Sequence, residues 1–428
     1  MRLMNLIGPM CLIGLISSCS SELEGPGTEV EKERTPIQLV GYMPSYVEQT
    51  SPTSEARGRN NSQFSILNSQ FSNGLTRTDP EWEPPTGYSL YTPSPQKTTA
   101  IGTFFTKDSP SEYIERRIFF NNNETDDPAD DHWYVEGKEA PTGDFYIYGY
   151  MPYNAANVTI EPETVDEVTG YQKGAVLTFT DMNSISTMDI CVIVGASHGT
   201  NAYTPVSLQT GKFGLCTMKK GGSGYENYLF LLMEHLYAKL EFCFRVDAEY
   251  AALRTIKLRK VELMGYTYTL GNLSDKEVMK EKGDIIVELK ANNTGTSPII
   301  NDILFRPDNT SNDMSPELLF EGDEELPTLT YTTETAYVPY FNLSGSGKVF
   351  YVLRSTYDVY DNNPSPGHPE GNLIRQGCVA ENLIVPNDRF NLSQLSRGTK
   401  YTLQLTVMPT YLYMMSEPDL DNPSVTLE

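Results

Sequence analysis

The feature that most restricts the fold of this chain is a strict alternation of apolar and polar residues with a period of two. Residues 238–246 read Ala-Lys-Leu-Glu-Phe-Cys-Phe-Arg-Val, so the large apolar side chains face one way and the charged ones face the other. A period of two is typical of a β-strand with one buried face. Residues 401–407 alternate in the same way. We therefore predict a half-buried strand at each place.

Other segments predict further strands and very little helix. Three runs are apolar on both faces, which is typical of strands covered on each side: 145–151, 190–194 and 349–353. Further strands are predicted near 37–40, 176–179, 256–263, 285–289 and 299–305. A slip of the apolar phase between Leu258 and Val261 indicates a bulge. Helix is expected only after a capping Asp247 and over residues 274–281.

The composition supports an all-β fold. The 428 residues include 27 tyrosines, 32 glycines and 28 prolines, but only 21% charged residues, a balance that favours strands and turns. The length and the number of strands predict two β-sandwich domains in tandem. We place the first at residues 36–270 and the second at 271–428, with the join anywhere in 235–280.

The N-terminal residues predict export. Arg2 is the only charge before an apolar run at 3–16, which is too short to span a bilayer and is typical of a signal peptide. The run ends in Ile16-Ser17-Ser18-Cys19, which resembles the lipobox of bacterial lipoproteins. That resemblance implies a signal peptide at 1–18 and a lipid on Cys19. The polar, acidic residues 19–35 are expected to form a disordered tether at the cell surface.

The net charge excludes two classes of partner. The formal charge is −24 and the isoelectric point is near 4.6. Phosphate contacts need clustered Lys and Arg, so binding to nucleic acid is not expected. Adsorption to an anionic lipid surface is disfavoured for the same reason. We therefore expect contact with the membrane only through the lipid on Cys19.

No arrangement of residues predicts catalysis, a metal site or a cofactor. There are four histidines, and neither a nucleophile elbow nor a phosphate-binding loop is present. The acidic stretches at 126–131, 321–325 and 419–421 lack the spacing of a calcium loop and are interpreted as solvated loops. His235 is interpreted as a packed or hydrogen-bonded residue. The cysteines beyond Cys19 form no CxxC pair, and their disulfide state stays open: Cys191, Cys216, Cys243 and Cys378.

Several motifs together resemble one family. Residues 234–242, Glu-His-Leu-Tyr-Ala-Lys-Leu-Glu-Phe, resemble the His-x-x-Ala-Lys-Leu-Glu-Phe strand of the Bacteroidetes fimbrillin superfamily, the subunits of type V pili. Gly398-Thr399-Lys400-Tyr401-Thr402-Leu403 resembles the last long strand of that family. Further matching segments are 37–40, 146–153 and 189–195. The likeness covers most of residues 37–410.

This resemblance implies a mode of assembly. Such subunits have two transthyretin-like sandwich domains of Greek-key type and reach the outer membrane as lipoproteins. An arginine-specific protease then removes the N-terminus with the first strand, and the next subunit fills the groove with a strand of its own. The strand to be exchanged would include Ile37, Leu39, Val40 and Tyr42. The preferred cleavage site is Arg57, followed by Arg59 and then Arg77.

Alternatives remain open at this point. Pro409, Pro418 and Pro423 interrupt the C-terminal tail, whereas a stalk subunit should end in a long donor strand, so a tip or capping subunit is equally acceptable. The chain could also stay intact as an anchor. A different class is a monomeric surface lipoprotein that binds glycans, which predicts exposed aromatic platforms. An enzyme is the third class, and no paired carboxylates or nucleophile and base support it. The adhesion ligand is unknown.

Overall fold

The computed structural model describes residues 34–50, 87–91, 100–107, 113–121, 132–137, 141–153, 157–163, 174–206, 208, 215–222, 224–290, 300–341, 343, 346–362, 366–367, 371–390, 392–410 and 419–427. These residues form twenty-three strands and two short helices, α1 (Ala248–Ala251) and α2 (Pro386–Phe390). The predicted all-β class is therefore confirmed. The signal peptide, Cys19, Arg57, Arg59, Arg77 and the acidic stretch 126–131 lie outside the described residues. No helix among those described has the length and apolar character needed to cross a membrane.

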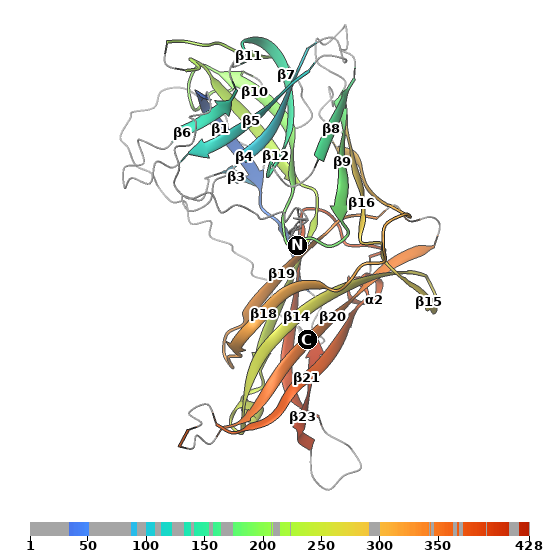
Figure 1. Cartoon of the computed structure of the whole chain (residues 1–428). Coiled ribbons are helices and arrows are strands. Elements are labelled where there is room, and N and C mark those ends of the chain that lie inside the picture. Colours follow the sequence, from blue (N-terminus) through green and yellow to red (C-terminus); the bar gives the residue numbers. More distant parts are fainter. Residues whose placement is uncertain are drawn as a thin grey trace, which may run out of the picture.

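The largest sheet has nine strands and occupies the upper part of the molecule in Figure 1. Its order is β10-β12-β1-β6-β5-β4-β7-β11, with β3 also paired to β1. A further pairing of β7 with β10 joins distant members of this order and closes the sheet on itself at that point. The strands are β1 (Arg34–Pro44), β3 (Tyr88–Leu90), β4 (Ala100–Thr106), β5 (Tyr113–Asn121), β6 (His132–Glu136), β7 (Gly143–Met151), β10 (Cys191–Gly199), β11 (Cys216–Met218) and β12 (Tyr228–His235).

Two five-stranded sheets form the lower part of Figure 1. One has the order β19-β13-β22-β2 with β23 on β22, and the other has the order β15-β14-β20-β21 with β18 on β14. The first contains β2 (Val47–Thr50), β13 (Ala238–Val246), β19 (Thr332–Val338), β22 (Thr399–Thr410) and β23 (Asp419–Leu427). The second contains β14 (Arg254–Thr269), β15 (Asn272–Val278), β18 (Glu317–Glu325), β20 (Gly347–Asp361) and β21 (Leu373–Ile384).

A four-stranded sheet has the order β17-β16-β9-β8. It consists of β8 (Asn157–Pro162), β9 (Gly174–Asn183), β16 (Lys282–Lys290) and β17 (Ile300–Pro307), so it joins strands that are far apart in the sequence.

The chain passes from the nine-stranded sheet into the β13–β22 sheet at two places. After β1, residues Ser45 and Tyr46 lead into β2, and after β12, residues Leu236 and Tyr237 lead into β13. β1 runs parallel to β12, and β13 runs parallel to β22. The second passage lies within the range 235–280 in which the join was expected, and the two-domain division stays a prediction.

Most strands predicted from the sequence are present. β13 spans residues 238–246, and β22 includes 401–407. The register of β14 shifts between Leu258 and Lys260 against both neighbours, as the slip of the apolar phase predicts. Asp247 caps α1 by accepting hydrogen bonds from the backbone N–H groups of Glu249 and Tyr250.

Three local predictions are wrong. Residues 274–281 contain no helix, because Gly271 adopts a φ of +88° in a tight turn that folds β15 back along β14. The acidic runs 321–325 and 419–421 are not loops but parts of β18 and β23. The first lies along β14, where Arg259 Nη1 reaches Asp323 Oδ1 at 2.9 Å and Lys257 Nζ reaches Asp323 Oδ2 at 3.6 Å. The second forms a strand because β23 pairs with β22.

The alternating strands bury two main apolar clusters. The larger extends from β7 and β10 through β13 and β14 to β22, and includes Phe242, Phe244 and Leu405, each with 2% or less of its surface exposed. The smaller, which we call the upper cluster, lies on the other side of the nine-stranded sheet and includes Ile37, Trp133, Val135, Leu229 and Leu231. Both clusters therefore depend on strands of the nine-stranded sheet.

Candidate functional site

The first strand, β1, lies in the interior of a sheet rather than at its edge. It pairs in parallel with β12, from Gln38 opposite Tyr228 to Tyr42 opposite Leu232. On its other side it pairs antiparallel with β6 over Arg34–Ile37 and with β3 over Tyr42–Pro44. Without β1, the backbone groups of β12 and β6 would lose their partners along one edge.

Side chains of β1 enter both apolar clusters. Ile37 is only 4% exposed in the upper cluster, and Leu39 and Met43 pack against the same cluster. Val40 and Tyr42 point the opposite way and pack against the larger cluster. The residues predicted for the exchangeable strand thus anchor β1 on both faces, and a shift of one residue would reverse every contact.

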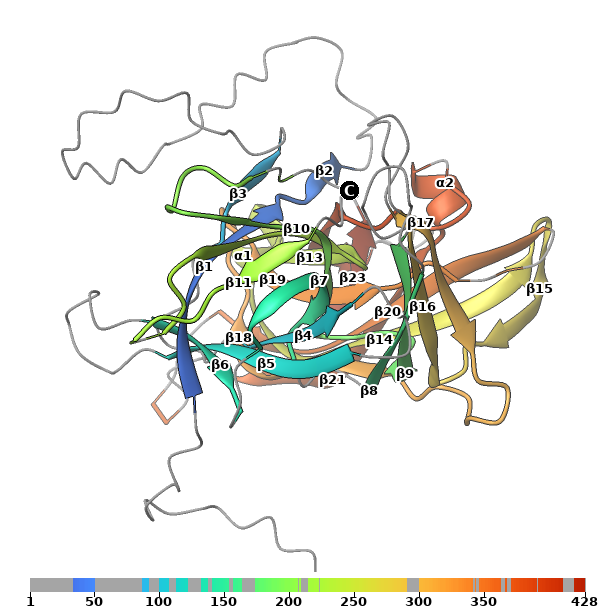
Figure 2. The same ribbon diagram turned by 90° about the horizontal axis from the view of Figure 1, so that it is seen from above.

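The same segment continues onto a second sheet. β2 pairs in parallel with residues 399–402 of β22, whose other edge is taken by β13. β23 pairs antiparallel with residues 405–410 of β22. β2 and β23 therefore pair with successive parts of the same edge of β22. Figure 2 shows β1, in blue, leading into β2. An ion pair reinforces the contact between β2 and β22, because Lys400 Nζ lies 2.7 Å from Glu48 Oε1. The hydrogen bond to Glu48 is the main reason that the pKa of Lys400 is raised.

A group of polar side chains fastens the segment between β1 and β2. His235 Nε2 donates to the carbonyl of Pro44 at 2.9 Å, and its Nδ1 lies 2.8 Å from Asp189 Oδ2. Tyr46 donates from its hydroxyl to Asp189 Oδ1 at 2.8 Å and stacks on the His235 ring with a centroid separation of 3.9 Å. We call Tyr46, Asp189, His235 and the Pro44 carbonyl the clasp.

The electrostatics of the clasp follow from its burial. The His235 side chain is 7% exposed and that of Asp189 is 24% exposed. Each nitrogen of the His235 ring faces an oxygen acceptor, and the ring donates both bonds only in its doubly protonated form. Burial, and then the negative charge of Asp189, raise the pKa of Tyr46, so that its hydroxyl stays protonated and remains a donor.

A second polar link lies beside the clasp. Glu234 accepts a hydrogen bond from the hydroxyl of Tyr88 at 3.0 Å and pairs with Arg397 at 2.5 Å. The backbone N–H of Val47 donates to the Gly398 carbonyl at 2.9 Å. β3, β12 and the start of β22 are thereby tied together where the first segment passes between the sheets.

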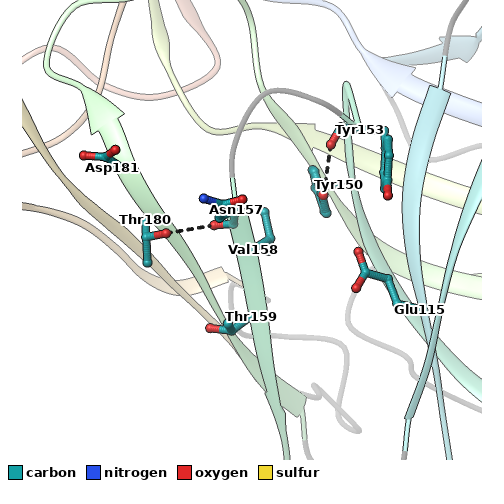
Figure 3. Close-up of a pocket in the computed structure, with 8 residues that line it drawn as sticks. All are labelled: Glu115, Tyr150, Tyr153, Asn157, Val158, Thr159, Thr180 and Asp181. Atoms are coloured by element: carbon teal, nitrogen blue, oxygen red, sulfur yellow. Dashed lines mark hydrogen bonds between the residues drawn. The ribbon is translucent and has the colours of Figure 1, made fainter. Parts of the chain in front are cut away.

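A hollow of about 530 Å³ lies elsewhere, between the nine-stranded sheet and β8–β9. Figure 3 shows Tyr150, Tyr153 and Glu115 on one wall, and Asn157 to Thr159 with Thr180 and Asp181 on the other. The two tyrosine rings stack with a centroid separation of 6.4 Å, and the hydroxyl of Tyr150 donates to the Tyr153 carbonyl at 3.0 Å. The mixture of aromatic faces, amide and carboxylates suits a polar organic ligand.

The sequence predicted the strand but not the clasp. His235 was expected to be packed or hydrogen-bonded, and it is hydrogen-bonded. Tyr46 and Asp189 were not singled out, because 143 residues separate them in the chain. One local signal could have indicated the site: Asp189, Cys191 and His235 lie at the ends of two apolar runs. These runs form the neighbouring strands β10 and β12. Cys191, Cys216, Cys243 and Cys378 are free thiols.

The chain is similar to solved structures of fimbrial and cell-adhesion proteins. A Bacteroides fragilis protein assigned to cell adhesion shares 11% identity with a TM-score of 0.39, over 92% of this chain and 97% of the other. A fimbrial protein from Bacteroides vulgatus shares 13% identity with a TM-score of 0.30, over 77% and 91%. The fimbrial anchor protein Mfa2 from Porphyromonas gingivalis shares 8% identity with a TM-score of 0.23, over 91% and 95%. No family model matches the sequence, and no curated protein matches it.

Proposed function

We propose that this chain is a surface-exported subunit of a fimbrial-type adhesive assembly, and that residues 34–50 form its exchangeable strand. The observation that supports this most is the position of β1, an interior strand near the start of the chain that continues into β2 on a second sheet. One cut after residue 50 would detach the whole segment from the rest of the chain. A strand from another subunit could then pair with the same edges.

The packing of β1 explains how an incoming strand would be recognised. Backbone pairing with β12 and β6 provides affinity for any extended chain, and the alternating pockets around Ile37 and Val40 set the register. Removal of β1 would expose the unpaired edges of β12 and β6, and chains with such open edges aggregate. Cleavage would therefore have to be coupled to assembly. Arg57, then Arg59 and Arg77, are the proposed cleavage sites, and all three lie between β2 and β3 in the sequence.

The C-terminal strand favours a tip or capping position within this proposal. The sequence predicted a tail broken by prolines, whereas residues 419–427 form β23 on the chain's own β22. The register shifts between Met408 and Thr410, beside Pro409, which is how a proline is tolerated in a ladder. Since β23 is already paired within the chain, it is not free to serve as a donor in this state.

Export belongs to the same proposal. Cys19 would carry the lipid that holds the chain at the outer membrane, and the folded part would lie on the outside of the cell. The proposed partners are other fimbrial subunits and an arginine-specific surface protease, and the adhesion ligand is not assigned. No catalytic step is proposed, and the expectation that the chain is not an enzyme stays a prediction.

Limited proteolysis tests this proposal. The purified full chain is treated with an arginine-specific protease, and fragments and assembly are followed by mass spectrometry and gel analysis without boiling. For a polymerising subunit we expect loss of the N-terminal segment and growth of SDS-resistant oligomers. For a cap we expect loss of the same segment and a stable complex in which the cleaved chain has accepted one strand and grows no further. Replacing Arg57, Arg59 and Arg77 together by lysine preserves the charge and should block the cut. A folded monomer that keeps residues 34–50 after complete cleavage at these sites, and never accepts another strand, would contradict the proposal.

A second candidate function, glycan binding, is favoured by the hollow beside Tyr153. Aromatic faces with neighbouring amide and carboxylate groups can contact both the apolar and the polar faces of a sugar ring. Tyr153→Ala should abolish binding on a glycan array, whereas Tyr203→Ala, at an exposed tyrosine away from the hollow, should not. Equal binding by both variants would exclude the hollow.

A further inference from the structure

Three side chains with metal-binding atoms meet at the clasp. Cys191 and His235 are paired across β10 and β12, and Asp189 lies on the connection just before β10. The Cys191 Sγ lies 3.4 Å from His235 Nδ1, which lies 2.8 Å from Asp189 Oδ2. All three ligand atoms lie within 4.8 Å of one another, and the sulfur and the imidazole are buried.

We propose that Asp189, Cys191 and His235 bind a divalent, borderline-soft cation of the zinc class. Zinc takes sulfur, nitrogen and oxygen at about 2.0–2.3 Å in a tetrahedral arrangement, so its ligand atoms are separated by roughly 3.3–3.6 Å. The observed sulfur–nitrogen separation already falls in that range. The carboxylate must withdraw from the ring by about half an ångström, and Asp189 can do so because it lies outside the strand ladder.

The charges balance when the site is occupied. A ligand atom must be free of its proton to bind a metal, so the site would offer one carboxylate, one thiolate and a neutral imidazole ring. The two negative charges would offset the two positive charges of a divalent cation. The buried net charge of the occupied site would therefore be zero.

The surroundings provide the supporting contacts that metal-bound histidines require. A ligating imidazole almost always donates its other N–H to a carbonyl or carboxylate, and His235 Nε2 donates to the Pro44 carbonyl. The hydroxyl of Tyr46 donates to the second oxygen of Asp189. The hydroxyl of Tyr237, two residues after the proposed ligand His235, is buried and makes no hydrogen bond.

The cation would join β12, the strand that pairs with β1, to its other neighbour, β10. Pro44 and Tyr46 belong to the first segment. Of the proposed ligands, His235 ends β12, Cys191 begins β10 and Asp189 lies just before β10. Metal binding would fix the ring that the Pro44 carbonyl and the Tyr46 ring contact. The proposal does not depend on strand exchange, because it concerns the full, uncut chain.

Cobalt substitution provides the test. The reduced full chain is titrated with Co²⁺ and then with Zn²⁺, and absorption is recorded between pH 6 and 8. We expect one equivalent of Co²⁺ with a thiolate-to-cobalt charge-transfer band, its displacement by Zn²⁺, and affinity that rises with pH because metal ligands must be deprotonated. Cys191→Ser should remove the band, and Asp189→Asn should weaken binding by at least about tenfold.

Matched controls separate this site from other donors. Cys216→Ser removes a buried thiol of the same sheet that is not a proposed ligand. His198→Gln removes a histidine of β10 that is not a proposed ligand. Both variants should therefore bind Co²⁺ like the parent. If Cys191→Ser does not fold, the charge-transfer band of the parent and the Asp189→Asn titration still decide. Absence of a thiolate band in the folded parent, or equal binding by Asp189→Asn and the parent, would overturn the proposal.

Discussion

Replacing Ile37 by alanine tests how β1 is held. The side chain is 4% exposed and packs among Trp133, Val135 and Leu229 in the upper cluster. Truncating a buried isoleucine costs about 2–5 kcal/mol, from lost burial and the cavity left behind. Taking about 3 kcal/mol, from the lower half of this range, the affinity of the strand for its groove should fall roughly 150-fold.

The assay measures that affinity directly. A fluorescent peptide of residues 34–50 is bound to the chain from which this segment has been removed by arginine-specific cleavage, and the parent peptide is compared with the Ile37→Ala peptide. Gln38→Ala is the matched control, because Gln38 is exposed on the same strand and should change the free energy by less than about 0.5 kcal/mol. Denaturant unfolding of the full-length Ile37→Ala variant should show the same ordering. Equal effects of the two substitutions would refute the reasoning.

Three further predictions concern the same region. Gly224→Ala should lower the midpoint of thermal unfolding, because a Cβ there would meet the Pro36 carbonyl at 2.6 Å at a φ of +151°, whereas Gly222→Ala, which meets nothing within 4 Å, should not. Tyr46→Phe should cost about 1.5–3 kcal/mol of protection from hydrogen exchange over residues 34–50, since a hydrogen bond to a charged group is lost; unchanged exchange would count against the clasp. Burial raises the pKa of Cys243 to about 11, so at pH 8 only about one molecule in a thousand holds its thiolate there. Its alkylation, read by mass spectrometry, should therefore speed up about tenfold per pH unit towards pH 11, and a rate that is flat with pH would be inconsistent with a buried thiol.

The sequence predicts single strands well and their partners poorly. Alternation identifies β13 and β22 because each has one buried face, and the slipped phase near Arg259 identifies the bulge in β14. The segment 274–281 misleads because it is a largely exposed hairpin strand, and its pairing with β14 outweighs its local helical pattern. The acidic run 321–325 misleads because its basic partners lie on β14, more than sixty residues earlier.

The candidate site could be predicted only in part. Ile37 and Val40 are identified as strand residues by local pattern, but nothing local shows that β1 is interior and parallel to β12. The clasp brings together Tyr46, Asp189 and His235, which are far apart in the sequence. They meet because the chain passes from one sheet to the other both after β1 and after β12. A search for closely spaced cysteines misses Cys191 as a metal ligand, because its proposed partner His235 is 44 residues away in sequence, on the neighbouring strand of the sheet.

The measurement that tests the central claim most directly is replacement of the first segment in trans. The chain is cleaved by the arginine-specific protease in the presence of excess isotope-labelled peptide 34–50, and intact complexes are weighed by native mass spectrometry. The account predicts one labelled peptide per chain, resistant to dilution, and suppression of any oligomer growth. Retention of the original unlabelled segment in every chain, with no uptake of labelled peptide after complete cleavage, would contradict it.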